Sequence, residues 1–455
     1  MATSRKNTKT KLFLSYFSFV LVVVVAAGLT GLMFFIAPAR AFTIYTVTRT
    51  DDPIPDSCLP TDCSLREAVR VANATPGADL IILAALTYTL NLTPTKMDFD
   101  GADGDLDITD DLIIQGTGAA STIIDGNHLD AILIIRDDNV TVTLNAITLR
   151  NGSSGYGGAI YSDGNLTLNE VVIRNNTSPA GPGGAIYVNY GSALTLNNST
   201  ITGNSATGSS VTGDTGGGIY NLGTVRLNNS TVSGNRSQGG GGGLANSGGV
   251  IYAINSTISD NRTDFNGGGI LNWNAGRVEL FNVTIAGNVA DNNDDNSGRG
   301  GGLLTEPGSP VVVRNSLIGN NFNWEGLFSY NPDDCAGTLV SGGGNLVETM
   351  TNCTLAAGDP GDNITGQDPK LDLLAGNGGS TRTHALQPGS PAIDAGTPSG
   401  CRGLGGSLLT TDQRGYPRPV DGGSGQSRCD IGAVEFGAVA PAPQTQPVYL
   451  PIVLK

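Results

Sequence analysis

The residues of this sequence that are best suited to bind a metal ion lie in one acidic stretch, residues 98–111 (DFDGADGDLDITDD). Carboxylate oxygens are the ligands that Ca²⁺ prefers, and closely spaced aspartates could wrap one ion. The spacing is not that of an EF-hand, which needs glycine at the sixth position and glutamate at the twelfth. An acidic turn before a strand at 112–115 is the competing interpretation. The calcium candidates are Asp98, Asp100, Asp103, Asp105 and Asp107.

Groups for acid–base or nucleophilic catalysis are scarce elsewhere. Elimination on acidic sugars needs calcium-binding carboxylates and a base, and hydrolysis needs paired carboxylates at a defined separation. Glu170 is the only acid in a repeated column of amides, and no carboxylate column is expected to face Arg236 and Arg262. His128 and His384 have no serine or cysteine partner at a motif spacing. We therefore predict no catalytic residue, no enzyme, and no cofactor other than the calcium considered above.

Aromatic side chains provide two candidate contact surfaces. Trp324 and Tyr330 fall in a segment that interrupts the repeat, and Trp and Tyr carry much of the binding energy at interfaces. We predict a ligand contact there, with packing of the segment over the neighbouring coil as the competing interpretation. Tyr161, Tyr187 and Tyr220 recur at one position of successive repeats. Their stack would stabilise a sheet and could also bind sugar rings.

A repeat between residues 157 and 321 must position these side chains. Its period is roughly 25 to 33 residues, which indicates a solenoid, and segments such as TVRLNNSTVSGN alternate apolar and polar residues with strand spacing. The aliphatic column is Ile160, Ile186, Ile219, Leu244, Ile270 and Leu303. The amide column is Asn145, Glu170, Asn198, Asn229, Asn255, Asn282 and Asn315. The closing column is Asn151, Asn176, Asn204, Asn235, Asn261, Asn288 and Asn321.

The chemistry of the unit selects the kind of solenoid. No unit holds a helical periodicity, glycine and asparagine permit tight corners, and hexapeptide periodicity is absent. In stacked parallel coils like residues lie over like, so the aliphatic column becomes a core and the asparagine columns become hydrogen-bonded ladders. We predict an all-β fold: a single-stranded, right-handed parallel β-helix with an N-terminal capping helix.

The repeat resembles that of the polymorphic outer-membrane proteins. The likeness is carried by GGAI at Gly157–Ile160 and Gly183–Ile186 and by units such as Ile173–Asn176, although this chain has Ile or Val where that family has Phe. The likeness concerns the repeat and not the adhesins as whole proteins.

The N-terminal third contains an export segment and a cap. Basic residues precede an apolar run that ends at Ala39-Arg40-Ala41, so residues 1–41 are predicted to be a signal peptide, with an uncleaved anchor as the alternative. Residues 63–68 read CSLREA, in which Ser64 and Glu67 form a capping box. This motif, DLIIL (79–83) and GDLDIT (104–109) resemble the CSLREA domain. We assign residues 42–115 to this cap and the first coils, because an open β-helix end invites association.

The regular coils are predicted at 116–340. After them the repeat pattern is replaced by other motifs. Residues 377–396, 411–419 and 429–435 (NGGSTRTHALQPGSPAIDAG, TDQRGYPRP and CDIGAVE) resemble the choice-of-anchor Q domain of bacterial surface proteins. We interpret 341–437 as its coils and cap, and 438–455 as a Pro/Ala linker with a short apolar tail. Six cysteines suggest disulfides outside the cytosol. By proximity the pairs are Cys58–Cys63, Cys335–Cys353 and Cys401–Cys429.

The charge of −15 argues against nucleic acid as a partner. We predict an exported monomer at the cell surface or outside the cell, structural or adhesive, in contact with extracellular polysaccharide or another surface component. Membrane contact is expected only through residues 1–41 if they stay uncleaved. The alternative function is a polysaccharide-active β-helix enzyme, either a pectate-lyase-like lyase or a hydrolase.

Overall fold

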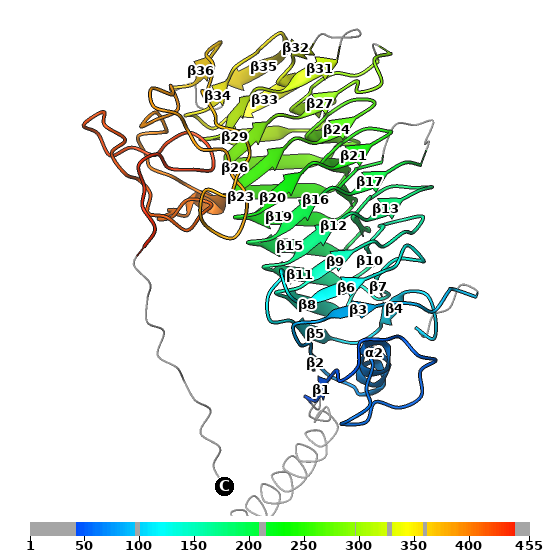
Figure 1. The fold of residues 1–455 in the computed structure, drawn as a ribbon. Helices are drawn as coiled ribbons and strands as arrows, with labels where there is room; N and C mark the ends of the chain where they lie inside the picture. The colour runs from blue at the N-terminus through cyan, green and yellow to red at the C-terminus, as the bar shows by residue number, and fades with distance from the viewer. Residues whose placement is uncertain are drawn as a thin grey trace, which may run out of the picture. The chain divides into compact units, whose positions relative to one another are not determined.

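The structure is a computed structural model that describes residues 42–95, 101–208, 215–295, 297–324, 330–357 and 362–441. The chain divides into two compact units, Met1–Phe42 and Thr43–Lys455, and the fold described here belongs to the second. Its strands stack coil upon coil into one solenoid (Figure 1). The strands of successive coils pair in parallel, which confirms the predicted right-handed parallel β-helix.

Three columns of strands run along the solenoid. The first column contains β1 (Ile44–Thr46), β2 (Asp79–Ile82), β5 (Leu112–Gln115), β8 (Thr141–Asn145), β11 (Asn165–Asn169), β15 (Ala193–Asn197), β19 (Thr224–Asn228), β23 (Val250–Ser259), β26 (Arg277–Ala286), β29 (Val311–Arg314), β33 (Cys335–Ser341) and β35 (Asn352–Ala357). The second contains β3 (Thr87–Thr89), β6 (Ile123–Asp125), β9 (Thr148–Arg150), β12 (Val172–Arg174), β16 (Thr200–Thr202), β20 (Thr231–Ser233), the ends of β23 and β26, β30 (Leu317–Gly319), β34 (Leu346–Val347) and β36 (Ile364–Thr365). The third contains β4 (Leu106–Ile108), β7 (Leu133–Ile135), β10 (Ile160–Ser162), β14 (Ile186–Val188), β18 (Ile219–Asn221), β22 (Leu244–Ser247), β25 (Ile270–Trp273) and β28 (Leu303–Thr305).

A separate sheet, which we call the corner sheet, follows the second column in each coil. It contains β13 (Thr177–Ser178), β17 (Ser205–Ala206), β21 (Arg236–Ser237), β24 (Arg262–Thr263), β27 (Val289–Ala290), β31 (Phe322–Trp324) and β32 (Tyr330–Pro332). Its members pair in parallel except β31 and β32, which form an antiparallel pair at its end. The corner sheet therefore carries one outward side chain from each coil along one edge of the solenoid.

The aliphatic column forms the core as predicted. Ile160 pairs with Ile186, and Ile219 pairs with Leu244, in strict register between coils. Every member of the column is fully buried. The next residue of each strand points outward because side chains alternate across a strand. The outward tyrosines stack as predicted: the ring centroids of Tyr161 and Tyr187 are 5.1 Å apart.

The amide column lies at tight corners of the backbone. All its members except Asn145 adopt left-handed backbone angles, with φ of 51° at Asn198 and 50° at Asn229, which asparagine tolerates better than most residues. Within the described chain, the only side-chain bond between two of these residues joins Asn315 and Asn282, so the predicted ladder is largely wrong for this column. The ladder lies one residue before the left-handed positions, where Asn169 donates to Asn145 and Asn197 donates to Asn169, each at 2.8 Å, so Asn145 belongs to this ladder.

The closing asparagine column forms a buried ladder, except for Asn151, whose amide donates to the carboxylate of Asp125 instead. Each side-chain amide donates to the next side-chain oxygen at 2.9 Å, from Asn176 through Asn321. The same oxygen also accepts a backbone N–H, so one residue satisfies several buried groups of its corner. The ladder ends on the carboxylate of Asp334, 2.9 Å from the Asn321 amide. Burial raises the pKa of Asp334 to about 7.

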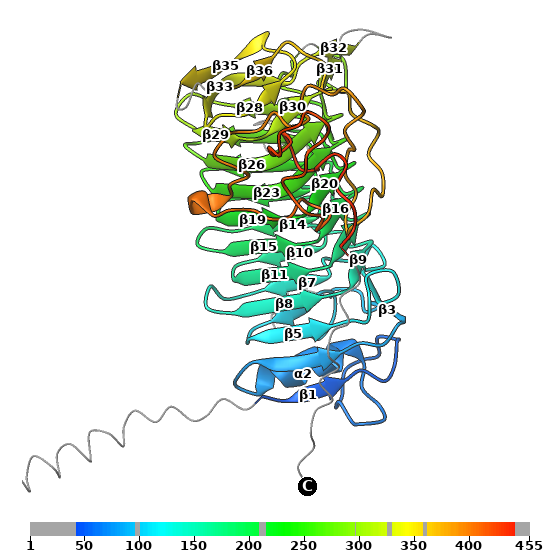
Figure 2. The same cartoon turned by 90° about the vertical axis from the view of Figure 1, so that its left-hand side faces the viewer.

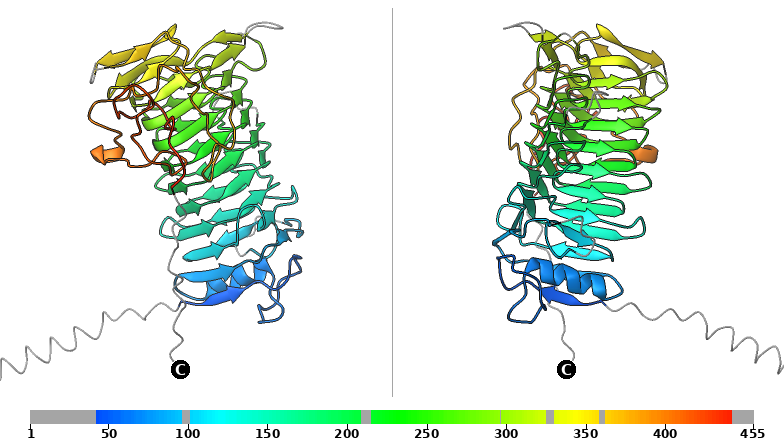
Figure 3. Two further views of the ribbon diagram at one scale, coloured as in Figure 1. Left: turned by 60° about the vertical axis from the view of Figure 1, so that its left-hand side comes forward. Right: turned by 90° about the vertical axis from the view of Figure 1, so that its right-hand side faces the viewer.

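The helix α2 (Leu65–Ala74) closes the N-terminal end of the solenoid (Figure 3). Ser64 and Glu67 form the predicted capping box, and Leu65, Ala68, Val69 and Ala72 are buried. The apolar face of the helix therefore lies over the open core, which fits the predicted capping role.

All three predicted disulfides are present, Cys58–Cys63, Cys335–Cys353 and Cys401–Cys429. Beyond β36 the chain no longer adds coils. Residues 366–441, which we call the strap, include the short 3₁₀ helix η1 (Leu404–Gly406) and fold back along the second column (Figure 2). The strap is attached through polar side chains: Asn255 donates to the Thr411 carbonyl at 2.8 Å, and Thr257 donates to Gln413 at 2.6 Å. The boundaries of the predicted segments stay predictions.

Candidate functional site

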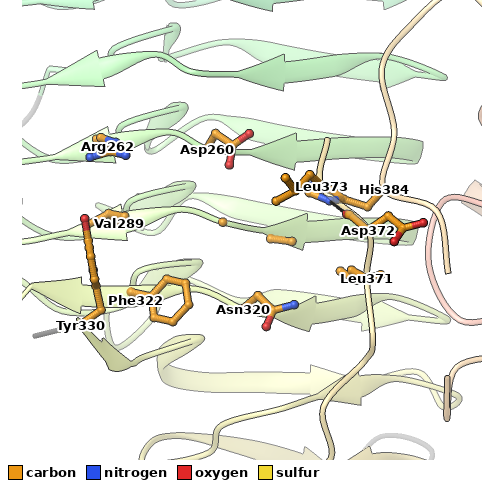
Figure 4. Close-up of a pocket in the computed structure, with 12 residues that line it drawn as sticks. Asp260, Arg262, Val289, Asn320, Phe322, Tyr330, Leu371, Asp372, Leu373 and His384 are labelled. Atoms are coloured by element: carbon orange, nitrogen blue, oxygen red, sulfur yellow. Dashed lines mark hydrogen bonds between the residues drawn. The ribbon is translucent and has the colours of Figure 1, made fainter. Parts of the chain in front are cut away.

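A groove of about 440 Å³ lies where the strap passes the corner between the second column and the corner sheet. Figure 4 shows its two sides: Arg262, Val289, Phe322 and Tyr330 of the corner sheet face the strap across Asp260 and Asn320. The strap side is formed by Leu371, Asp372, Leu373 and His384. Leu373 is 88% exposed. The groove is thus a surface site built from two parts of the chain that are distant in sequence.

The corner geometry opens the floor of the groove. Asp260, Gly287 and Asn320 occupy equivalent corners in successive coils, with φ of 57°, 74° and 58°, where Gly, Asn and Asp are favoured. A Cβ atom at Gly287 would come within 2.5 Å of Asp260 Oδ1. Glycine at this position therefore leaves room for the carboxylate of Asp260.

The floor carries opposite charges that are not paired with described residues. Asp260 and Arg262 are both exposed, and in the ranges that the structure describes neither side chain has a hydrogen bond or ion pair. Arg236 lies next to Arg262 in the parallel register and is paired with Asp264 at 3.3 Å. No carboxylate column was expected to face these arginine corners, but a single carboxylate, that of Asp264, does reach Arg236. Asp264 comes from the loop after β24, and its approach to Arg236 could not be read from the columns.

An aromatic cluster forms one wall. The β31–β32 pairing places the ring of Trp324 4.6 Å from that of Tyr330, and Phe322 lies 5.6 Å from Tyr330, both edge to face. Tyr330 is 45% exposed, and Phe322 and Tyr330 line the groove. The structure thus brings both predicted contact residues together, on an exposed pair of strands.

His384 lies at the inner edge of the groove and has a partner that motif spacing did not predict. Its Nε2 atom is 2.8 Å from the hydroxyl of Ser259, and its Nδ1 atom is 2.7 Å from the backbone oxygen of Asp372. Both residues are buried, and burial lowers the pKa of His384. Because the Ser259 hydroxyl is fully buried, we assign this pair to attachment of the strap. No sequence spacing could reveal it, since 125 residues separate the two.

The predicted calcium residues fall into two groups. Asp98 and Asp100 lie outside the described residues. Of the others, Asp107 is paired with Arg136, and Asp103 accepts from the Thr95 hydroxyl at 2.6 Å. Backbone carbonyls of this loop, including those of Gly104 and Asp105, accept from Arg66, which is fully buried and also paired with Asp52. A guanidinium therefore occupies the position facing those carbonyls, and calcium binding by the loop stays a prediction.

The residues that the structure describes contain neither a metal-binding cluster nor a membrane-spanning helix. Those residues contain no group of three or more His, Cys, Asp or Glu side chains placed to hold a metal ion. None of the helices described is both long and apolar enough to cross a bilayer. The predicted signal or anchor, residues 1–41, and the tail from 442 onward lie outside the described residues.

Comparison with known proteins supports the class of fold. Residues 112–280 match the family model described as a right-handed β-helix region, which is less than half of the chain. The chain is similar to the crystal structure of pectate lyase Pel9A, with a TM-score of 0.51 and 17% identity over 87% of this chain and 96% of that one. A PL6 alginate lyase complex with trisaccharide covers 79% of this chain and 93% of its own, at 10% identity and a TM-score of 0.24. No curated protein sequence matches significantly.

The likeness to the pectate lyase structure, at 17% identity, establishes the fold alone. The prediction that the chain is not an enzyme is corrected on this ground: a lyase is built on the same architecture, so the fold gives no reason to exclude catalysis. That prediction rested on columns without carboxylates. The groove described above shows why columns were an insufficient criterion: its charged groups come from corners and from the strap.

Proposed function

We propose that this protein acts on an acidic polysaccharide, which it binds in the groove of Asp260 and Arg262. The observation that carries the proposal is the pair of unpartnered, opposite charges on a groove floor beside an aromatic wall. Ligand sites commonly combine apolar walls with a few polar groups that fix orientation. The likeness in fold to a pectate lyase supports the same substrate class.

Each part of the groove has a counterpart in a uronate chain. The planar guanidinium of Arg262 can bind a uronate carboxylate through two parallel hydrogen bonds. The rings of Phe322 and Tyr330 offer an apolar surface for the face of a sugar, and the tyrosine hydroxyl adds a polar contact. The amide of Asn320 can bond to sugar hydroxyls. These contacts select a charged polysaccharide over a neutral one.

The same groups could support elimination. With the uronate carboxylate bound by Arg262, the proton on the adjacent carbon becomes more acidic because the developing negative charge is stabilised. Asp260 takes that proton as the general base, the electron pair forms a C=C bond, and the bond to the glycosidic oxygen breaks. The leaving oxygen takes a proton from water, and the hydroxide so formed takes the proton from Asp260, which restores the carboxylate. The product has an unsaturated sugar at its new end.

We further propose that the protein is exported and held at the cell surface. The three disulfides favour an oxidising compartment, and residues 1–41 have the layout of a signal peptide or anchor. The CSLREA-like motif at 63–68, the GGAI repeats and the segments resembling the choice-of-anchor Q domain support attachment to a bacterial surface. A polysaccharide outside the cell is a substrate that such a protein would meet.

The test is an ultraviolet assay for unsaturated products on polygalacturonate and alginate, with dextran as the neutral control. We expect Asp260→Asn and Arg262→Ala to abolish product formation. Arg236→Ala, which removes the adjacent but paired arginine, should retain most of it. Absence of both cleavage and binding with each acidic polysaccharide would refute the proposal.

A structural or adhesive role is the second candidate, and the contact of the half-buried Trp324 with the exposed Tyr330 favours it. Such a surface can hold a sugar chain without cleaving it. Saturable binding without unsaturated or reducing ends would assign the groove to adhesion.

A further inference from the structure

The loop that follows β27 contains a buried carboxylate with one unpartnered oxygen. Asp291 is fully buried. Its Oδ1 atom accepts from the backbone N–H of Asp295 at 3.2 Å, whereas its Oδ2 atom has no hydrogen-bond partner among the described residues. Asp291, Asn293 and Asp295 alternate along the chain, the spacing with which calcium loops supply their first ligands. In such loops the first aspartate likewise points a free oxygen at the ion.

A second orphaned oxygen lies in the next coil. Asn323 of β31 pairs in register with Ala290, the residue before Asp291. Its amide nitrogen donates to the Gly298 carbonyl at 2.8 Å, but its Oδ1 atom is buried without a partner in the described part of the chain. Gly298 is also packed against Asp291, since a Cβ atom at Gly298 would meet the Cβ of Asp291 at 2.8 Å. The two residues that carry the orphaned oxygens therefore contact the same glycine.

Two unsatisfied acceptors on residues that contact one glycine require an explanation, because each buried group without a partner is costly. A bound cation would satisfy the Asp291 and Asn323 oxygens at once and offset the repulsion between the carboxylates. The donors are all oxygens, which fits Ca²⁺ and not the nitrogen- or sulfur-rich sites of Zn²⁺.

We propose that Asp291, Asp295 and Asn323 bind one Ca²⁺ ion, with water completing its coordination. These proposed ligands are two carboxylates from one loop and one amide from the strand of the next coil. The ion would join the loop after β27 to β31, the strand that also carries Phe322 and Trp324. Calcium would thereby order the aromatic wall of the groove. None of the proposed calcium ligands is a residue assigned to polysaccharide binding, so calcium binding can be tested independently of the proposed function.

The test is isothermal titration of the calcium-stripped full chain with CaCl₂, in the absence of polysaccharide. We expect one ion per chain and a higher thermal midpoint in CaCl₂ than in EGTA. Asp291→Asn should weaken binding at least about tenfold, because it removes a charged ligand. The substitution suits the fold: asparagine tolerates the φ of 51° at this position and can still accept from the Asp295 N–H.

Asp295→Asn is the second variant and should weaken binding similarly. Asp138→Asn, which removes one charge from an exposed loop elsewhere, should leave the affinity unchanged. Asp103→Asn tests the acidic loop after the cap. No calcium binding by the intact chain would show that water satisfies both oxygens and would overturn the proposal. Binding lost in Asp103→Asn and retained in Asp291→Asn would overturn it as well, by placing the ion in the other loop.

Discussion

Replacing Asn261 by leucine tests whether the buried asparagine ladder stabilises the corners. Its Oδ1 atom accepts from the backbone N–H and the amide of Asn235, and its amide donates to the Val232 carbonyl and to Asn288 Oδ1. In the leucine variant the Asn235 N–H loses its acceptor in a fully buried position, at a cost of about 1–3 kcal/mol. Three further hydrogen bonds are lost at roughly 1 kcal/mol each. We expect the free energy of unfolding to fall by about 3 kcal/mol or more.

Asn197→Leu is the matched control. Asn197 makes the same kind of ladder bonds, to Asn169 and from Asn228, but it lies in the half-buried outer ladder where water can replace a lost partner. Its loss should therefore be about 1 kcal/mol or less. Both variants can be compared by urea unfolding followed by circular dichroism. The slope of the unfolding free energy against urea concentration must be the same for both, because solenoids can unfold in parts. If the slopes are equal and the free energies of unfolding of the two variants differ by less than about 1 kcal/mol, the buried ladder does not stabilise the corners more than the outer one.

Two further predictions concern the strap and the aromatic wall. Burial lowers the pKa of His384 below its ordinary value of 6.5, so its neutral form supports the fold above that pH, and stability should fall as the pH drops below about 6.5 and through the folded pKa. His384→Gln should flatten this part of the profile of thermal midpoint against pH, and identical profiles for both proteins would contradict the assignment. Replacing Trp324 and Tyr330 together by alanine should abolish polysaccharide binding in a pull-down assay with little change in thermal midpoint; a large fall in the midpoint would instead assign the pair to packing.

The candidate site was only partly predictable. Trp324 and Tyr330 were recognised because large aromatics interrupt a small-residue repeat, and the β31–β32 pairing brings them together. Arg262 was noticed as a repeated corner, but Asp260 was not, since its importance depends on the space left by Gly287. Asp291 and Asn323 were also missed, because their orphaned oxygens lie in different coils. The role of Arg66 was not predicted either, because the CSLREA motif indicated only a helix and not the buried ion pair of Arg66 with Asp52.

The sequence by itself determined the solenoid. Because parallel stacking places each repeat directly over the last, residues at equivalent positions of the repeats are also in contact in the structure. The buried aliphatic column, the closing asparagine ladder and the capping box follow from spacings of a few residues or of one repeat. Only the tertiary structure decided the groove. It depends on the strap folding back over the coils, as in the contact between Ser259 and His384. Such contacts have no period, and many placements of an irregular chain satisfy the same local preferences, so only the packed structure distinguishes among them.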